Sequence, residues 1–377
     1  MQDNTDPVWA IGLMTGTALD GFVDVALIRT DGETVFEFGE FALFPYADTD
    51  RAVLQDAVAA ARAWAFDGPE PAIFAKAEAI ITRIYASAIQ QLLAQANMNP
   101  DAVGYVGGHG LTVLHRPDLG RTRQLLDGPA LARAVGIDVV YDFRTADMVA
   151  GGQGAPLAPI YHAAILARTD FPPPCAILNL GGVANVTWWG GGLELAAFDT
   201  GPANGPVNEW VEAHGRGSYD KDGALAGAGR VHEGRLLEIL DNPWFDAPYP
   251  KSLDRYDFDG GLVRGLSLED GAATLTALVG ASLNLALSIL PTRPKTIIVA
   301  GGGRKNPVMM ADIEARCGVK LMDADAVGLR GDAVEAECFA LLAVRSARGL
   351  ALSFPMTTGV NVPTTGGVMA RFSGEIS

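Results

Sequence analysis

The chain has 377 residues, enough for two or three domains with large apolar cores. Hydrophobic residues make up 49% of it and charged residues 19%, without a long low-complexity tract, which argues against disorder outside the ends. The formal net charge of −16 argues against nucleic acid and anionic membrane surfaces as partners. A small anionic ligand is still compatible, because backbone N–H groups and a few local cations can bind it.

Three features of the sequence bear on the compartment of the protein and on membrane insertion. The N-terminal sequence MQDNTDPVWAIGL lacks the basic segment and long apolar core of a secretory signal. The cysteines Cys175, Cys317 and Cys338 are far apart and have neither disulfide nor zinc spacing. The longest apolar stretch, Ala272 to Leu290, is interrupted by threonine, serine and asparagine, which favours a buried helix over a membrane span. We therefore expect a protein of the reducing cytoplasm.

The N-terminal region predicts a strand, a glycine loop and a hairpin. Ala10 to Leu13 is apolar, Met14 to Gly21 is a polar loop, and Val23 to Arg29 and Thr34 to Phe38 read as strands joined by a turn. A glycine loop after a strand lets backbone N–H groups approach phosphate oxygens, because no Cβ stands in the way. An ordinary turn is the alternative interpretation.

Helices and a short buried strand follow. Arg51 to Phe66 and Pro71 to Asn97 have helical spacing, and Val103 to Val106 reads as a strand that leads into Gly107-Gly108-His109-Gly110. His109 thus falls at a strand end. A substrate contact and a buried structural histidine both remain open for it.

Residues 142–157, DFRTADMVAGGQGAPL, lie between a predicted strand, Asp138 to Tyr141, and a predicted helix, Ile160 to Ala167. Acids, an arginine, glycines and a glutamine in one run are typical of a substrate site. Arg144 offers a planar fork of donors to a carboxylate or phosphate. The alternative is an Asp-Arg pair that braces a loop.

The second half repeats the pattern of the first. Three prolines, Pro172 to Pro174, suggest a hinge, so we predict lobes at residues 1–172 and 173–377. A strand from Cys175 meets Gly181-Gly182, a second strand follows, and a third runs from Leu193 to Asp199. The repetition indicates a duplicated domain, and it places the Asp199 carboxylate where a strand opens into a loop.

Three further segments bear on function. Asn242 to Phe258 is rich in aromatics and proline, which suits a loop that closes over a sugar or an ordinary loop packed by its own aromatics. A strand, Thr296 to Val299, leads into Ala300 to Gly303, a junction that can pass close to a nucleoside. A helix is predicted over Asp332 to Arg348, with Glu335 in its first turn.

Two hairpin-first α/β halves, three strand-to-glycine junctions and the strand-end Asp199 describe the two-lobed actin-like ATPase fold of sugar kinases, with the nucleotide in an interlobe cleft. No GxxxxGK[ST] sequence occurs, which excludes a P-loop kinase. No strand is followed by GxGxxG with an acid about twenty residues on, so a dinucleotide-binding fold is not indicated either.

Segments in order along nearly the whole chain resemble the anhydro-N-acetylmuramic acid kinase family. The combination of DFR, GGQGAPL and FDTGP in one chain is highly specific. The matching segments are GLMTGTALDG (Gly12–Gly21), HGLTVLHRP (His109–Pro117), VVYDFRTADMVAGGQGAPLAP (Val139–Pro159), NLGGVANVT (Asn179–Thr187), FDTGPAN (Phe198–Asn204), YPKSLDR (Tyr249–Arg255), AGGGRKNP (Ala300–Pro307), VEAECFA (Val334–Ala340) and FPMTTG (Phe354–Gly359).

The resemblance implies an enzyme, usually a homodimer, that uses ATP, Mg²⁺ and water. It opens the 1,6-anhydro ring of anhydro-N-acetylmuramic acid and phosphorylates O6, in peptidoglycan recycling. The family's general base falls on Asp199, and its substrate-positioning arginine and glutamate fall on Arg144 and Glu335.

The resemblance also implies the binding residues. Asp20 is the candidate for holding Mg²⁺ through water, because magnesium needs only one or two carboxylates. The residues expected to bind ATP and its phosphates are Gly12, Met14, Thr15, Gly16, Thr17, Asp20, Gly181, Gly182, Asn185, Gly301 and Gly302. The residues expected to bind the anhydro-amino sugar are His109, Arg144, Gly154, Ala155, Pro156 and Asp199.

The chain departs from the family pattern at several positions, which affects the expected fit of the substrate more than the reaction class. The departures are Thr15 and Ala18 for serines, one extra residue between Gly21 and Asp24, Leu111 for glutamine, Ala203 for glycine, Asn208 for aspartate, and Leu253-Asp254 for a Thr-Gly pair. Two alternatives stay open. One is a kinase of the same fold that phosphorylates an ordinary sugar hydroxyl. The other is a nucleotide-binding regulator without the chemistry, against which Asp199, Arg144 and Glu335 argue.

Overall fold

The computed structural model describes residues 6–16, 19–253, 257–331 and 333–373. The chain forms two compact units: unit 1 comprises residues 1–168 and 332–377, and unit 2 comprises residues 169–331. The sequence analysis assigned residues 332–377 to the second lobe. They belong to unit 1 instead, because helix α11 (Val334–Ala347) packs on the sheet of that unit.

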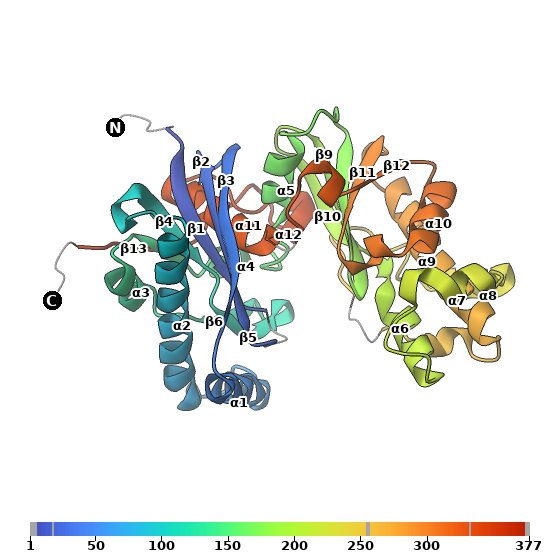
Figure 1. The fold of residues 1–377 in the computed structure, drawn as a ribbon, viewed down its shortest axis with the longest axis horizontal. Helices are drawn as coiled ribbons and strands as arrows, with labels where there is room; N and C mark the ends of the chain where they lie inside the picture. Colours follow the sequence, from blue (N-terminus) through green and yellow to red (C-terminus); the bar gives the residue numbers. More distant parts are fainter. Residues whose placement is uncertain (1–5, 17–18, 254–256, 332, 374–377) are drawn as a thin grey trace. The chain divides into compact units, whose positions relative to one another are not determined.

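Unit 1 contains a mixed sheet with the strand order β13-β7-β4-β1-β2-β3 (Figure 1). The first three strands in the chain form an antiparallel meander, while β4 lies parallel to β1 and β7 parallel to β4. The strands are β1 (Val8–Met14), β2 (Phe22–Thr30), β3 (Val35–Pro45), β4 (Val103–Gly108), β7 (Val139–Tyr141) and β13 (Val368–Ala370). The other elements are α1 (Asp48–Trp64), α2 (Ile73–Gln95), the hairpin β5 (Leu111–Arg116) and β6 (Arg121–Leu125), α3 (Gly128–Val135), α4 (Thr145–Val149), α5 (Pro159–Leu166) and α12 (Pro355–Thr358).

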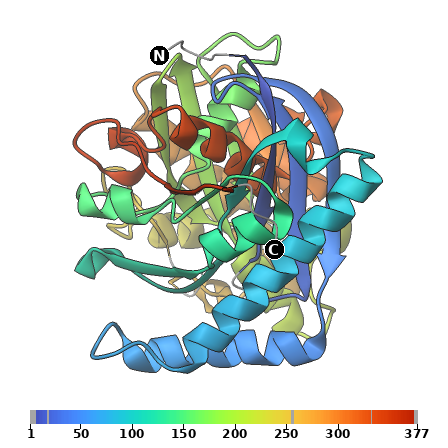
Figure 2. The ribbon, with the colours of Figure 1, turned by 90° about the vertical axis from the view of Figure 1, so that its left-hand side faces the viewer.

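Helices cover both faces of this sheet, as the side-chain alternation along β1 requires. Ile11 and Leu13 join the apolar core formed with α1, α2 and α3, and Figure 2 shows α2 crossing in front of the strands. Gly12 faces the other way, onto α11. A Cβ at Gly12 would lie 1.8 Å from the Ala336 carbonyl oxygen, so only glycine allows this helix to approach the strand so closely.

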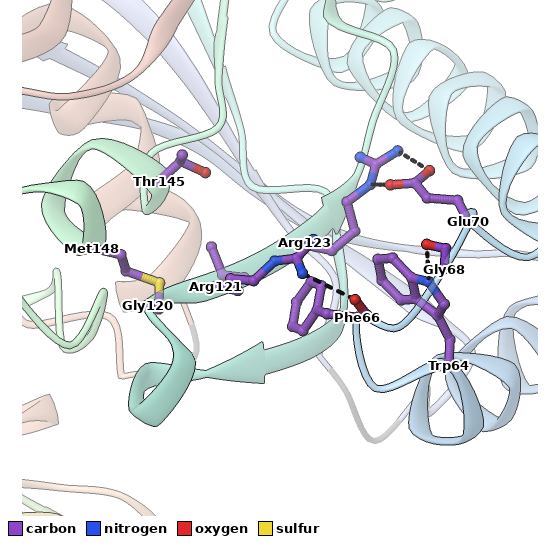
Figure 3. A pocket seen from close by; sticks show the side chains of 10 residues that line it. Trp64, Phe66, Gly68, Glu70, Gly120, Arg121, Arg123, Thr145 and Met148 are labelled. Atoms are coloured by element: carbon purple, nitrogen blue, oxygen red, sulfur yellow. Dashed lines mark hydrogen bonds and ion pairs between the residues drawn. The ribbon is translucent and has the colours of Figure 1, made fainter.

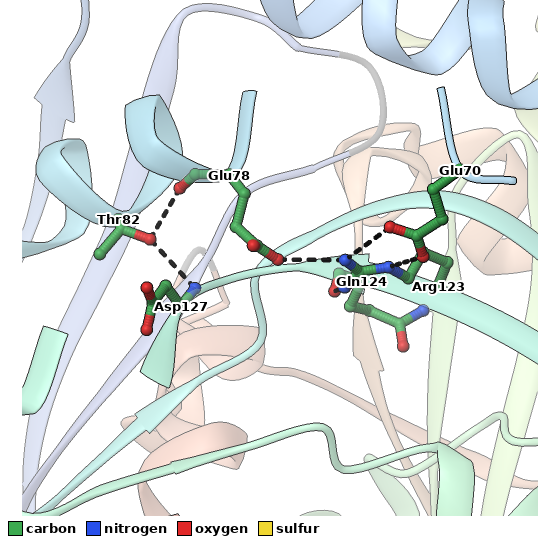
Figure 4. Close-up of polar contacts among 6 residues, drawn as sticks. All are labelled: Glu70, Glu78, Thr82, Arg123, Gln124 and Asp127. Atoms are coloured by element: carbon green, nitrogen blue, oxygen red, sulfur yellow. Dashed lines mark hydrogen bonds and ion pairs between the residues drawn. The ribbon is translucent and has the colours of Figure 1, made fainter. Parts of the chain in front are cut away.

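The β5–β6 hairpin is attached to α2 by polar contacts (Figure 4). Arg123 of β6 forms ion pairs with Glu70 at 2.8 Å and with Glu78 of α2 at 3.2 Å. Thr82 of α2 accepts a hydrogen bond from the Asp127 backbone N–H at 3.1 Å. The Asp127 carboxylate in turn caps α3 through the N–H of Ala130. These contacts hold the β5–β6 hairpin, which follows His109 in the chain, against α2.

Unit 2 repeats the strand order of unit 1. Its sheet is β10-β9-β8-β11-β12, with an antiparallel meander followed by two parallel strands. Numbered in chain order within each sheet, the strands read 3-2-1-4-5 in unit 2 and 3-2-1-4-5-6 in unit 1, where β13 adds a sixth strand at the edge. The shared 3-2-1-4-5 order confirms the predicted duplication and the actin-like ATPase fold. Its elements are β8 (Cys175–Leu180), β9 (Val183–Gly191), β10 (Glu194–Pro202), α6 (Asn204–Ala213), α7 (Ala224–Ala228), α8 (Glu233–Leu240), α9 (Leu268–Ser288), β11 (Thr296–Ala300), α10 (Pro307–Cys317) and β12 (Lys320–Asp323).

Helix α9 is long and apolar enough to cross a membrane by composition, but 83% of its most apolar window is buried inside the protein. It is the central helix of unit 2, in agreement with the sequence prediction of a buried helix. The cysteines Cys175, Cys317 and Cys338 are also buried, and each is a free thiol.

One local prediction needs correction, and one strand was not predicted. The third strand of unit 2 does not end at Asp199, because β10 continues to Pro202 through a bulge between Asp199 and Gly201. Gly201 has φ +151, and the hydroxyl of Thr200 donates to the Ala184 carbonyl at 3.2 Å, so pairing with β9 resumes beyond the bulge. The strand β13 near the C-terminus was not predicted, and it pairs with β7.

Candidate active site

Arg144 lies at the N-terminal end of α4, directly after the strand β7, and its guanidinium is held by neutral groups. Nη1 donates to the Gly154 carbonyl at 2.7 Å, while Nε and Nη2 donate to His109 Nε2 at 3.1 and 2.9 Å. Among the described residues no carboxylate lies within ion-pair distance of Arg144, so an Asp-Arg brace is not seen. A guanidinium has five N–H groups, so two remain, one on each Nη.

His109 accepts from Arg144 as a neutral imidazole. Its Nδ1 lies 2.9 Å from the Gly110 carbonyl, which can only accept, so Nδ1 carries the proton and Nε2 is free to accept. Burial lowers the pKa of His109 well below its ordinary value, and the adjacent Arg144 charge lowers it further. The ring also packs against Phe339 of α11, with 4.6 Å between centroids. His109 therefore orients Arg144. The sequence left open a substrate contact or a buried structural histidine, and His109 is a buried histidine that contacts a predicted substrate-binding residue.

Glu335 lies in the first turn of α11, whose position on the sheet depends on Gly12 and on Gly107. The surrounding protein partly desolvates its carboxyl and raises the pKa, while the charge of Arg144 acts in the opposite direction. Arg144 and Glu335 are thus electrostatic neighbours within unit 1. The fold brings together a cation and an acid that are far apart in the sequence.

Asp199 occupies the bulge of β10 in unit 2. Its backbone N–H donates to the Lys251 carbonyl at 3.0 Å, and its Oδ2 accepts from the Leu253 N–H at 2.8 Å. Burial raises the pKa of Asp199, and the Leu253 hydrogen bond partly offsets this effect. Within the described residues Oδ1 has no hydrogen-bond partner, which leaves one carboxylate oxygen for a ligand.

A row of polar side chains crosses the sheet beside Asp199. Asn185 of β9 lies opposite Asp199 in one ladder and opposite Asn179 of β8 in the other. All three are half-buried, whereas their neighbours along the strands are mostly buried and apolar. The sequence analysis included Asn185 and missed Asn179. An amide within the apolar run of β8 was the signal that could have found it.

The loop after β1 has the geometry expected of a ligand-binding loop at Gly16. A Cβ at Gly16 would have no neighbour within 4 Å, so the space beside it is open. Asp20 is exposed, and its Oδ1 accepts from the Phe22 N–H at 3.2 Å. Gly12 and Thr15 are buried, the former by α11, and Met14 is half-buried. Thr17 and Ala18, named in the sequence analysis, lie outside the described residues.

The Gly181-Gly182 turn is anchored on the N-terminal end of α6. The Gly181 carbonyl accepts from the Asn204 N–H at 3.0 Å, and the Gly182 carbonyl accepts from the N–H groups of Ala203 and Gly205 at 3.0 and 3.1 Å. Because C=O and N–H of a trans peptide point in opposite directions, the N–H groups of Gly182 and Val183 point away from α6. They are available to an anion such as a phosphate.

The two glycines of the third junction differ. Gly301 has φ +80 and packs so closely that a Cβ would lie 2.5 Å from Asn179 Oδ1 and 2.7 Å from the Leu180 carbonyl. A Cβ at Gly302 would meet nothing within 4 Å. Gly301 therefore shapes the turn, and Gly302 leaves room for a ligand beside the backbone.

The aromatic segment that precedes Leu253 packs on itself and on β10. Tyr249 stacks on Phe198 with 4.9 Å between centroids, and Lys251 Nζ lies 4.4 Å from the Trp244 ring centroid. Lys251 also donates to the carbonyls of Trp244 and Phe245 at 3.1 and 2.8 Å. This packing supports the interpretation of the segment as a loop held by its own aromatic side chains. The same loop places the Leu253 N–H within hydrogen-bond distance of Asp199.

A pocket of about 350 Å³ opens in unit 1, at the β5–β6 hairpin (Figure 3). Its lining includes Phe66, which lies under the Arg121 guanidinium at 4.4 Å, and Thr145 and Met148 of α4. None of the residues predicted to bind ATP or sugar lines it.

Comparison with known proteins decides the family. A model of the family described as anhydro-N-acetylmuramic acid kinase matches residues 8–371. The chain belongs to the anhydro-N-acetylmuramic acid kinase family. It is 56% identical over 365 residues to the anhydro-N-acetylmuramic acid kinase of Brucella anthropi, covering 96% of this chain and 98% of that protein. It is 53% identical over 369 residues to that of Mesorhizobium japonicum, covering 97% and 100%.

Membership in the anhydro-N-acetylmuramic acid kinase family confirms the resemblance seen in the sequence, and with it an enzyme of the sugar kinase class. A solved structure is similar to the chain at low identity and low TM-score. A glucokinase of the ROK family from Streptomyces griseus, in complex with glucose and AMPPNP, is 16% identical with a TM-score of 0.39, covering 89% of this chain and 99% of that chain.

The residues at which the chain is expected to depart from the pattern of the anhydro-N-acetylmuramic acid kinase family are buried to different extents. Leu111, where the sequence analysis expected the family to have glutamine, is fully buried in the apolar core of unit 1 and contributes to its packing. Ala203 is buried where its N–H donates to Gly182, while Asn208 on α6 is half-buried. Asp254 lies outside the described residues.

Proposed function

We propose that Asp199 is the general base of an ATP-dependent reaction that opens the 1,6-anhydro ring of anhydro-N-acetylmuramic acid and phosphorylates O6. The observation that supports this proposal best is the hydrogen bonding and burial of the Asp199 carboxylate. Oδ2 is fixed by the Leu253 N–H at 2.8 Å, and burial raises the pKa, so Oδ1 is an oriented base of increased proton affinity.

The bond changes follow from that role. Oδ1 removes a proton from water as the water oxygen bonds to the anomeric carbon, and the bond between that carbon and O6 breaks. The freed O6 then bonds to the γ-phosphorus of ATP as the bond to the β,γ-bridging oxygen breaks. The products are N-acetylmuramic acid 6-phosphate and ADP, with the proton on Asp199. Such general-base help typically contributes about a hundredfold to ten-thousandfold in rate.

Arg144 binds the lactyl carboxylate of the sugar in this proposal. Its three hydrogen bonds to His109 and Gly154 fix the plane of the guanidinium, and one N–H on each Nη remains. Two parallel N–H groups match the two oxygens of a carboxylate. Glu335 orients a sugar hydroxyl nearby, and the Gly154-Ala155-Pro156 backbone borders the sugar. Arg144 belongs to unit 1 and Asp199 to unit 2.

The phosphates of ATP are proposed to bind at the open glycines. Gly16 of the first loop, the N–H groups of Gly182 and Val183, and Gly302 each leave room for a ligand beside the backbone. No cluster of three or more metal-ligating side chains occurs among the described residues. The residues nevertheless fit Mg²⁺, because the ion keeps several waters when it is bound to phosphates, and the exposed Asp20 supplies one carboxylate. The ion would neutralise phosphate charge.

Mass analysis of the product made in ¹⁸O-labelled water tests the coupled hydrolysis. We expect one label at the anomeric oxygen and none in the phosphate. Product without label at that position would contradict water attack. A kinase of ordinary sugar hydroxyls would instead consume ATP only with free amino sugars, and a regulator would bind ATP without sugar-dependent turnover.

Oligomeric state and compartment complete the proposal. The family resemblance predicts a homodimer, which sedimentation of the purified protein tests. The three buried free thiols suit a reducing cytoplasm.

A further inference from the structure

Asp147 is a buried carboxylate that the proposed mechanism does not use. It lies on α4, one turn after Arg144, and only 2% of it is exposed. Its Oδ2 accepts from the Gly154 N–H at 2.6 Å, and its Oδ1 accepts from the Thr358 hydroxyl at 2.6 Å. Because both oxygens are occupied by groups of the protein itself, Asp147 is not free to bind a substrate.

Gly154 connects this carboxylate to the site. Its N–H is held by Asp147, and its carbonyl accepts from Arg144 Nη1 at 2.7 Å. A displacement of the Gly154 peptide would therefore move the acceptor that orients the guanidinium. Burial lowers the pKa of Arg144, and the charge of Asp147 is one of the contributions that act in the opposite direction.

The glycine-rich loop, residues 151–154, lies close to the side chains of α4. A Cβ at Gly152 would lie 2.3 Å from Asp147 Oδ2, and one at Gly154 would lie 2.8 Å from Met148 Cγ. Gly154 has φ +73, a conformation that glycine adopts without strain. The loop is thus packed directly onto α4.

The segment after α11 closes the arrangement. Thr358 is fully buried at the end of α12, and its carbonyl accepts from the Gln153 N–H at 2.7 Å while its hydroxyl donates to Asp147. A helix as short as α12 is not stable by itself, so it depends on such contacts. Thr358 therefore binds both the loop and the carboxylate.

We infer that Asp147 and Thr358 are positioning residues: through Gly154 they hold the Arg144 guanidinium in the orientation that leaves two N–H groups for the carboxylate of the sugar. This inference rests on the proposed role of Arg144. It gives the FPMTTG segment, which the mechanism leaves without a role, a function in sugar affinity.

Thr358→Val tests the inference, because it keeps the shape of the side chain and removes the hydroxyl. We expect the KM for the anhydro sugar to rise about tenfold, the loss expected for one hydrogen bond to a charged group, with the KM for ATP unchanged. Thr358→Ser, which keeps the hydroxyl, should restore most of the affinity. Thr30→Val is the matched control: Thr30 is also fully buried in unit 1. Its hydroxyl donates to the Thr34 carbonyl at 2.7 Å and accepts from the Gly32 N–H at 2.9 Å, and both of these partners lie in the segment that joins β2 to β3.

Amide hydrogen exchange provides a readout that does not depend on turnover. In Thr358→Val, exchange at Gly152 to Gly154 should become faster, while Thr30→Val should leave it unchanged. The inference is overturned if Thr358→Val raises the KM for the sugar no more than Thr30→Val does, or raises both KM values equally, or if Thr358→Ser is impaired to the same extent. If the wild-type protein does not turn over the anhydro sugar at all, the proposed function fails, and the exchange experiment still decides whether Thr358 holds the loop.

Discussion

Replacement of Gly12 by alanine tests how α11, the helix that carries Glu335, is placed on the sheet. The new Cβ would lie 1.8 Å from the Ala336 carbonyl oxygen and 2.4 Å from the Ala340 nitrogen. Both are backbone atoms that no side-chain rotation can remove, so α11 must move away by about 1 Å or more to reach ordinary contact distance. Overpacking of this kind costs about 3 kcal/mol or more, at the upper end of the usual range. For a unit of this size the loss corresponds to a fall in Tm of roughly 6–12 °C.

Calorimetry of Gly12→Ala and Gly16→Ala separates packing from ligand binding. A Cβ at Gly16 meets nothing within 4 Å, so Gly16→Ala should melt close to the wild-type temperature while binding ATP more weakly. Gly12→Ala should melt at a lower temperature and, because α11 carries Glu335, should also raise the KM for the sugar. A Gly12→Ala protein with the wild-type Tm would refute the close approach of helix and strand.

The remaining predictions concern the charged groups of the site. Asp199→Asn should lower kcat by about a hundredfold to ten-thousandfold while ATP still binds; wild-type turnover would remove Asp199 from the mechanism. Because burial raises the pKa of Asp199, its charged form is penalised in the folded protein, so Asp199→Asn should be at least as stable as wild type at neutral pH, and any gain should fade as the pH falls through that pKa. A base must be deprotonated, so kcat/KM should fall on the acid side at a pH above the ordinary aspartate value. The pKa of Glu335 is also raised, so Glu335→Gln, which lacks that carboxyl, is the control. The fall of kcat/KM at acid pH should persist in Glu335→Gln; if it disappears, the titrating group is Glu335 and not Asp199. Arg144→Lys should raise the KM for the sugar about tenfold or more, because lysine lacks the planar fork, and unchanged sugar kinetics would contradict bidentate binding.

Local signals in the sequence were sufficient for most secondary structure. The helical spacing over Pro71 to Asn97 corresponds to α2 (Ile73–Gln95), and the hairpin-first pattern around Gly181-Gly182 corresponds to β8, β9 and β10. The end of β10 was misplaced because Thr200, Gly201 and Pro202 are turn-forming residues. Pairing with β9 beyond a bulge outweighs that preference, and only the partner strand reveals it.

The sequence alone also determined the family and the candidate reactive groups, because the DFR, GGQGAPL and FDTGP segments are specific as strings of residues. It left open why each glycine is present. Gly12 and Gly301 are explained by backbone atoms that lie within 3 Å of where a Cβ would be, whereas Gly16 and Gly302 face open space.

Only the tertiary structure decided how the reactive groups are held. His109 accepts from Arg144, Asp147 accepts from Thr358, and Leu253 donates to Asp199 across sequence separations of 35, 211 and 54 residues. Hydrogen bonds of that range depend on how strands and helices pack, which leaves no periodic trace in the chain. The sequence therefore indicated which groups are candidates for the chemistry. The tertiary structure decided how they are held: Arg144 by His109 and Gly154, and Asp199 by the Leu253 N–H.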